Sequence, residues 1–162
     1  MKEELANELY DKFPTVLTDT CEVTGIVTKC YLDIGDGWYD LITTICDGVI
    51  SNQKRHEANT KLLIKMGKQQ ETKEYYPVKA VQIKEKFGGL RFYVSGGDEF
   101  DRGVIFTAEA MSRKICETCG QKGKTRDDGW MITLCDEHAE QRRWRKENES
   151  KTTILPDSGQ MG

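Results

Sequence analysis

The sequence has no apolar run approaching the roughly 20 residues that a membrane-spanning helix needs. Its first residues, Met1 to Leu5, also lack the apolar stretch of a secretory signal peptide. We therefore expect no membrane association and a cytoplasmic location. In a reducing compartment the six cysteines favour metal binding over disulfides.

The sequence also lacks a strong excess of charge of either sign. The formal net charge is -3, which gives no overall attraction to nucleic acid or to a membrane surface. The charge is unevenly placed, however. Residues 1–60 carry 5 Lys/Arg against 11 Asp/Glu, whereas residues 113–146 carry 9 against 6. The C-terminal part is therefore mildly basic and the N-terminal part acidic.

A chain of 162 residues with 37% hydrophobic residues can bury one modest core. Helical spacing of apolar residues predicts helices over 3–13, 38–55 and 101–115. Two alternating stretches flank Gly88-Gly89, and a Gly-Gly turn predicts a β-hairpin over 78–95. The expected apolar face of this hairpin carries Val81, Ile83, Phe87, Leu90, Phe92 and Val94.

The predicted fold class is α+β, with the β-hairpin packed on two helices and a treble-clef-like Cys3His zinc module at the C-terminal end. An isolated hairpin is marginal in water, so its apolar face must meet the helices at 38–55 and 101–115. The predicted divisions are an N-terminal helix with an irregular segment, an α+β core, a zinc module and a flexible tail. Their bounds are 1–30, 31–115, 116–149 and 150–162.

The zinc prediction comes from a double spacing. Cys116 and Cys119 lie two residues apart, fifteen residues follow, and Cys135 and His138 are again two residues apart. Gly120 permits the tight turn of a zinc knuckle, and a strand over 130–134 leads into a helix that contains the second pair. Four N/S ligands close a tetrahedron, which predicts one structural Zn²⁺ per chain and no catalytic position.

Only two histidines are present, and this scarcity argues against an enzyme of the treble-clef nuclease class. His138 belongs to the zinc set, and His56 lies in a polar stretch where we expect an ordinary surface histidine. Acidic residues at 33–40 and 98–101 offer carboxylates for a second metal, but their positions at helix starts predict capping instead. Cys21 and Cys30 have the wrong spacing for a knuckle and are expected to be free thiols.

Two small clusters combine cations with an aromatic side chain, as single-strand binders do. One is the polar hairpin face and the other the last helix. Their candidate residues for nucleic-acid or partner binding are Lys84, Lys86, Arg91, Tyr93, Arg142, Arg143 and Arg145. The alternative is that both are simply solvated surfaces.

Three stretches together resemble a family of small, mostly uncharacterised phage and prophage zinc-binding proteins. They are GDGWYDLI at 35–42, QIKEKFGGLRFY at 82–93, and CxxCG from Cys116 followed by GW and LCDEHA up to 139. The resemblance covers about residues 30–140. It implies a phage accessory protein in the cytoplasm of a bacterial host, and it brings no catalytic residues.

These observations favour a non-catalytic binding protein that engages a host protein or nucleic acid to modulate a host process or defence. A nucleic-acid-binding regulator is the first alternative, and a metal-dependent nuclease-like enzyme is the second. Whether the chain is an enzyme stays open at this point, with the closed zinc set favouring the non-catalytic interpretation. Assembly into a homo-oligomer is also left open.

Overall fold

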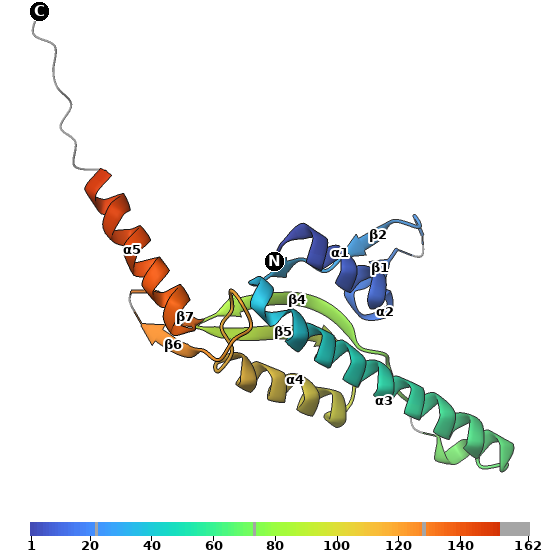
Figure 1. The fold of residues 1–162 in the computed structure, drawn as a ribbon. Coiled ribbons are helices and arrows are strands. Elements are labelled where there is room, and N and C mark those ends of the chain that lie inside the picture. The colour runs from blue at the N-terminus through green and yellow to red at the C-terminus, as the bar shows by residue number, and fades with distance from the viewer. Residues whose placement is uncertain (22, 73, 128, 153–162) are drawn as a thin grey trace, which may run out of the picture.

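The computed structural model describes residues 1–21, 23–72, 74–127 and 129–152, with side chains as far as Asn148. The described chain is mixed α+β, with small sheets and five α-helices (Figure 1). The helices are α1 (Glu3–Lys12), α2 (Pro14–Leu17), α3 (Tyr39–Lys65), α4 (Glu99–Ser112) and α5 (Asp136–Thr152). The 3-10 turns are η1 (Asp36–Trp38) and η2 (Gln69–Glu71). Residues 153–162 of the predicted tail lie outside the described residues.

The strands form three small sheets. β1 (Thr18–Thr20) pairs with β2 (Val27–Lys29), and β6 (Lys124–Asp127) pairs with β7 (Met131–Leu134), both antiparallel. The central sheet has the order β3-β4-β5, from β3 (Leu32–Asp33), β4 (Lys79–Lys86) and β5 (Gly89–Ser95). Strand β3 runs parallel to β4, and β4–β5 is the hairpin.

One apolar core joins the central sheet to the helices of the N-terminal two thirds of the chain. From the sheet come Ile83, Leu90 and Phe92, which meet side chains of η1, α3 and α4. Helices α1 and α2 contribute Leu9, Phe13, Val16 and Leu17 to the same cluster. The prediction of a hairpin packed on two helices is therefore confirmed, and the N-terminal helices belong to the same core.

The hairpin turn lies one residue earlier than the sequence predicted. Its central residues are Phe87 and Gly88, with φ of 53° and 72°, instead of Gly88 and Gly89. Two positive φ values describe a type I′ turn, whose twist matches that of the strands. The observed pairing of β4 with β5 therefore differs from the predicted pairing by two positions, so most side chains stay on the predicted face of the sheet. A bulge near Val81 and the turn itself expose two side chains predicted to be apolar contacts, Val81 and Phe87.

The outer edge of β5 is satisfied by side chains of α4 instead of a further strand. The Leu90 amide donates to Ser112 Oγ (2.8 Å), and the Phe92 amide donates to Glu109 Oε1 (2.8 Å). An exposed edge would offer these N–H groups to another chain. Helix α4 therefore both covers the core and blocks this edge.

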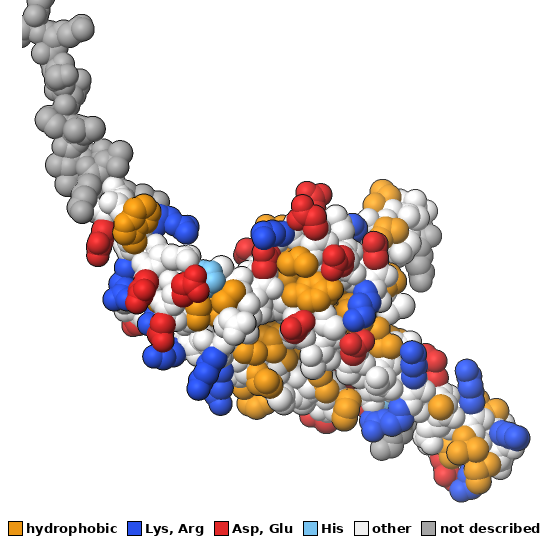
Figure 2. Space-filling model, viewed as in Figure 1, with side chains coloured by type: hydrophobic (Ala, Val, Ile, Leu, Met, Phe, Trp, Pro, Cys, Tyr) orange, Lys and Arg blue, Asp and Glu red, His pale blue; other side chains and the backbone are white. Residues whose placement is uncertain are grey.

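Helix α3 continues ten residues past the predicted end near residue 55, to Lys65. The apolar periodicity stops at Ile50, but residues 51–66 contain no Gly or Pro that would end the helix before Gly67, which has φ +73°. Its far end and η2 project from the rest of the molecule, and hydrophobic side chains are visible there between charged ones (Figures 1 and 2). No described helix, α3 included, is long and apolar enough to cross a membrane.

Candidate metal centre

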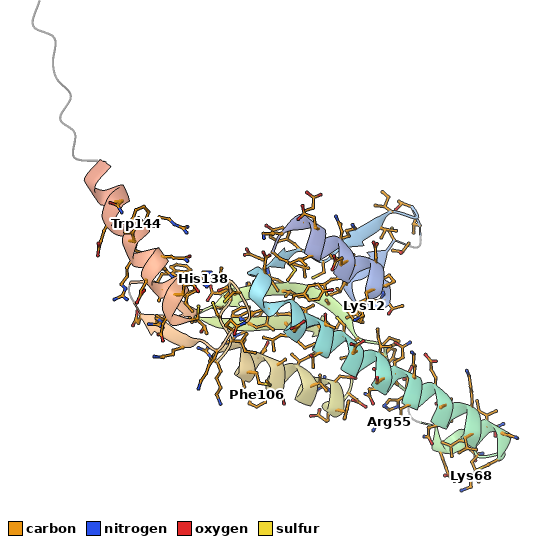
Figure 3. The ribbon with its side chains drawn as sticks, viewed as in Figure 1. Lys12, Arg55, Lys68, Phe106, His138 and Trp144 are labelled. Carbon is orange, nitrogen blue, oxygen red and sulfur yellow. The ribbon has the colours of Figure 1, made fainter. Side chains whose placement is uncertain are left out.

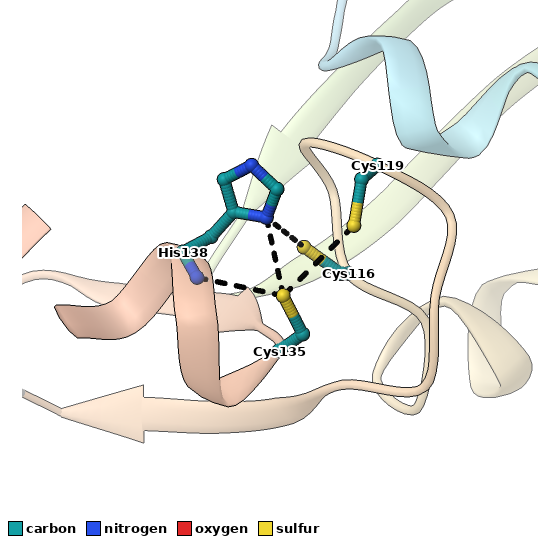
Figure 4. Close-up of side chains that lie close together, drawn as sticks. All are labelled: Cys116, Cys119, Cys135 and His138. Atoms are coloured by element: carbon teal, nitrogen blue, oxygen red, sulfur yellow. Dashed lines mark hydrogen bonds between the residues drawn. The ribbon is translucent and has the colours of Figure 1, made fainter. Parts of the chain in front are cut away.

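Four side chains converge at the C-terminal end of the fold: Cys116, Cys119, Cys135 and His138 (Figure 4). Their ligand atoms all lie within 4.8 Å of one another. Cys119 Sγ is 3.9 Å from Cys135 Sγ, and His138 Nδ1 is 3.7 Å from Cys116 Sγ and 3.1 Å from Cys135 Sγ. These residues, which we call the metal cluster, could hold one metal ion. In the part of the chain that the structure describes, no other group of three or more such side chains lies this close together.

The first pair of ligands lies on a tight loop after α4. The Gly120 amide donates to the Cys116 carbonyl (2.9 Å), and the Cys116 amide donates to the Gln121 carbonyl (2.7 Å). Gly120 has φ +76°, the left-handed conformation that its position in the sequence predicted. Burial alone would raise the pKa of the Cys116 thiol, but backbone N–H groups around it lower that pKa to about 7. The loop thus favours the thiolate form of Cys116. For Cys119, a backbone hydrogen bond at Gln121 is outweighed by burial and by the neighbouring thiols of Cys116 and Cys135, which raise its pKa to about 11.

The second pair of ligands lies where β7 passes into α5. Cys135 follows the last residue of β7, and His138 lies in the first turn of α5. The Ala139 amide donates to the Cys135 carbonyl (3.1 Å), and the His138 amide lies 3.5 Å from Cys135 Sγ. The helix start therefore fixes the spacing between the thiolate and the imidazole.

The loop that carries Cys116 and Cys119 docks on the turn η1. The Gly37 amide donates to the Glu117 carbonyl (2.8 Å), and Trp38 Nε1 donates to the Ile115 carbonyl (3.0 Å). A Cβ on Gly37 would lie 2.2 Å from the Cys116 carbonyl oxygen, so only glycine permits this approach. Two stretches about 80 residues apart in sequence therefore form one backbone contact.

The hairpin tip docks on the sheet β6–β7. Buried Thr133 Oγ1 donates to the Gly88 carbonyl (2.6 Å), and Arg113 Nη1 donates to the Phe87 carbonyl (2.9 Å). A Cβ on Gly88 would lie 2.8 Å from Thr125 Cγ2. All three stretches that carry the phage-type resemblance thus meet at the C-terminal module, residues 116–149.

The predicted partner-binding residues lie on two different elements. Lys84, Lys86, Arg91 and Tyr93 share the outer face of the hairpin, as predicted, with Lys84 Nζ 5.6 Å from the centre of the Tyr93 ring. Arg91 lies 4.0 Å from Glu109, so part of its charge is balanced. The remaining predicted residues, Arg142, Arg143 and Arg145, lie on α5.

A groove of about 470 Å³ runs between α5 and the sheet β6–β7. We call it the α5 groove. It is lined by Thr118, Trp130, Ile132, Leu134, His138, Gln141, Arg142 and Arg145. Arg142 and Arg145 therefore take part in it, whereas Arg143 does not. Trp130 was placed only in the predicted strand over 130–134 and not among the candidate binding residues, although an aromatic residue directly before β7 (Met131–Leu134) was a signal for such a role.

His56 differs from the expected surface histidine. It is half-buried, and its Nε2 lies 2.7 Å from Asp98 Oδ2 while its ring stacks on Tyr75, with centroids 4.2 Å apart. Asp98 is the N-cap of α4 and forms a capping box with Asp101, so the capping prediction for this acidic pair is confirmed. Asp36 is not an N-cap, because its carboxylate instead accepts the Lys2 amide (2.7 Å).

The network around Asp98 predicts a stability that depends on pH. Burial would raise the pKa of Asp98, but hydrogen bonds from His56, from Asn52 and from two α4 amides outweigh it and lower that pKa to about 2. A carboxyl whose folded-state pKa is lowered stabilises the fold above its unfolded-state pKa and loses this contribution as pH falls towards its folded-state value. We expect Asp98→Asn to be less stable than the wild type above about pH 5, where the unfolded carboxyl is also ionised.

The gap between the two free energies of unfolding should shrink as the pH falls from about 4 to about 2. Urea denaturation of both proteins across this range measures it. Loss of metal in acid affects both proteins alike and cancels in the difference. A gap that stays constant with pH would mean that the Asp98 charge contributes nothing.

No family model, no curated protein and no solved structure matches this chain. The resemblance to phage and prophage proteins therefore stays a prediction from three motifs.

Proposed function

We propose that the metal cluster binds one structural Zn²⁺ per chain and that the C-terminal module is a treble-clef-like fold. Three thiolates and one imidazole are the donors that structural zinc sites use. A zinc tetrahedron has S···S edges of about 3.8 Å and S···N edges of about 3.5 Å, given the usual bond lengths. The distances of 3.9 Å and 3.7 Å fit these edges, and the 3.1 Å contact of Cys135 with His138 is shorter.

Four protein ligands leave the zinc no open position for water or substrate, so its role would be to hold the module together. The loop before β6 and the β7–α5 junction would supply two ligands each, as in a treble clef. The remaining histidine, His56, is bonded to Asp98 and stacked on Tyr75, which is a structural use. These features support a non-catalytic protein over a nuclease-like enzyme.

The α5 groove is the observation that carries the proposed function. It combines an exposed indole, two guanidinium groups and an amide on a module that docks on η1 through its ligand loop and on the hairpin tip through Thr133. Trp130 is 65% exposed, and tryptophan and arginine are the side chains that most often dominate binding interfaces. We infer a binding protein whose partner, a host protein or nucleic acid, docks in this groove. The resemblance adds the context: a phage accessory protein that modulates a host process or defence in the bacterial cytoplasm.

A capture experiment tests this function. The tagged full-length chain, with metal bound, is used to capture partners from bacterial lysate. We expect a protein or nucleic acid that the wild type recovers and that Arg142→Ala/Arg145→Ala loses. Arg143→Ala is the matched control, because Arg143 lies on the same helix outside the groove. Recovery of nothing, or equal recovery by all three proteins, would refute the proposal.

A further inference from the structure

We propose that the α5 groove binds single-stranded nucleic acid, with a base stacked on Trp130 and backbone phosphates held by Arg142 and Arg145. This inference rests on the proposed function and names the partner of the same site. It uses three observations: the exposed indole, the placement of the two guanidinium groups, and the absence of carboxylates among the described side chains that line the groove.

The indole of Trp130 lies at a groove with an apolar floor. Leu134 is buried and Ile132 is half-buried beneath it, whereas Trp130 remains 65% exposed. An exposed aromatic ring beside apolar side chains gains from a flat apolar partner on its free face. Every nucleobase offers such a face, so a base can stack on the indole whatever its sequence.

The cations of the groove share one face of α5. His138, Gln141, Arg142 and Arg145 are spaced i, i+3, i+4 and i+7, which places them along one stripe of the helix. Among the described side chains, neither arginine forms an ion pair, and the described lining of the groove contains no Asp or Glu. The described part of the groove therefore presents positive charge to an anionic partner. The planar guanidinium group binds phosphate through two parallel hydrogen bonds.

Single-stranded nucleic acid fits this arrangement better than a duplex or an acidic peptide. In a duplex the base faces are already stacked, so Trp130 would have no base to receive. An acidic peptide would satisfy the arginines but would leave the indole without a flat ring. Stacking combined with cations along the backbone is the usual mode of sequence-tolerant single-strand binding.

The experiment is an anisotropy titration of labelled 12-nucleotide DNA and RNA single strands, and of the matching DNA duplex, with the full-length metal-bound chain. We expect binding of at least one single strand in preference to the duplex. Two phosphate contacts predict that log affinity falls with log salt with a slope of about -1.4. Arg142→Ala and Arg145→Ala should each weaken binding several-fold and reduce the slope by about 0.7.

The role of Trp130 is tested by a pair of variants and a control. Trp130→Ala should weaken binding about tenfold, which corresponds to about 1.4 kcal/mol of stacking. Trp130→Phe keeps an aromatic ring and should retain most of the affinity. Trp144→Ala is the control, because Trp144 is a similarly exposed tryptophan on α5 (Figure 3) but is not among the residues that line the groove. Its affinity should stay within twofold of the wild type.

Each outcome bears on one proposal or on both. Equal binding of duplex and single strand, or binding that ignores Trp130→Ala, would overturn this inference. If no oligonucleotide binds but a lysate protein is captured and lost in Arg142→Ala/Arg145→Ala, the inference fails and the proposed function stands. If neither oligonucleotide nor lysate partner binds, both fail. One zinc per chain in every variant shows that loss of binding does not come from unfolding.

Discussion

Cys119→Ser is expected to abolish metal binding and to unfold the C-terminal module. The module has almost no apolar core of its own, since the buried residues of its cluster are Cys116, Leu134 and Ala139. Cys116 is itself a metal ligand, and Leu134 and Ala139 are next in sequence to the ligands Cys135 and His138. Loss of the metal is therefore expected to disrupt this packing as well. Binding of zinc to small structural sites contributes about 10–16 kcal/mol, and this binding energy is folding energy.

The effect should extend into the main core. The Trp38 indole N–H donates to the carbonyl of Ile115, the residue directly before the module, and the module supplies Thr133 to the hairpin tip at Gly88. If unfolding of the module displaces Ile115, the fully buried Trp38 loses its acceptor, and a buried donor without a partner costs about 1–3 kcal/mol. We therefore expect a lower free energy of unfolding for the core as well as loss of the module.

Three measurements check this result: metal content per chain, thermal unfolding with and without a strong chelator, and tryptophan fluorescence, to which Trp38, Trp130 and Trp144 all contribute. Cys21→Ser is the matched control, because Cys21 is exposed and lies outside the metal cluster. It should keep one zinc and the wild-type midpoint. A Cys119→Ser protein that still binds one zinc and melts with the wild type would show that the metal cluster is not a structural site.

The parts of the site that sequence spacing could predict are those made by neighbours in the chain. Cys116 with Cys119 and Cys135 with His138 each lie within one turn of backbone, so their convergence followed from local geometry. The strand before Cys135 and the helix after it followed from the same short stretch. The predicted faces of the hairpin are also correct for most residues despite the wrong turn position, because an even shift in register keeps a side chain on its side of the sheet. The exceptions are Val81 at the bulge and Phe87 in the turn.

The parts that sequence could not predict depend on contacts between distant segments. Nothing local to Gly37 indicates that its backbone meets Cys116, 79 residues later. His56 sits in a polar stretch of α3, and only the fold brings Asp98 and Tyr75 to it. The turn at Phe87 was missed because a bulky residue at positive φ is uncommon, and the docking of the tip on β6–β7 holds it there. The role of Trp130 in the α5 groove depends on the position of α5, which only the fold provides.

Gly37→Ala is expected to lower the free energy of unfolding by about 3 kcal/mol or more, at the upper end of overpacking effects. The added methyl would lie 2.2 Å from the Cys116 carbonyl oxygen and 2.3 Å from the Gly120 amide nitrogen. Both are backbone atoms of a loop that two metal ligands hold, so they cannot move aside as a flexible side chain would. The loop must instead separate from η1, which breaks the bond between the Gly37 amide and the Glu117 carbonyl.

The comparison with Gly103→Ala makes the steric argument specific. Gly103 lies inside α4, and nothing stands within 4 Å of the Cβ it would carry. Alanine there should stabilise the protein by about 0.5–1 kcal/mol, because glycine is the poorer helix former. Urea denaturation of the two variants should therefore give free-energy changes of opposite sign.

Gly37→Ala and Cys119→Ser together also separate the docking of the loop on η1 from metal binding. Gly37→Ala leaves all four ligands inside the C-terminal module, so it should keep one zinc per chain while losing stability. Cys119→Ser should lose both. A Gly37→Ala protein as stable as the wild type would mean that the loop and η1 do not pack as described. A Gly37→Ala protein that also loses its zinc would mean that the ligand loop needs its docking on η1 to form the metal cluster.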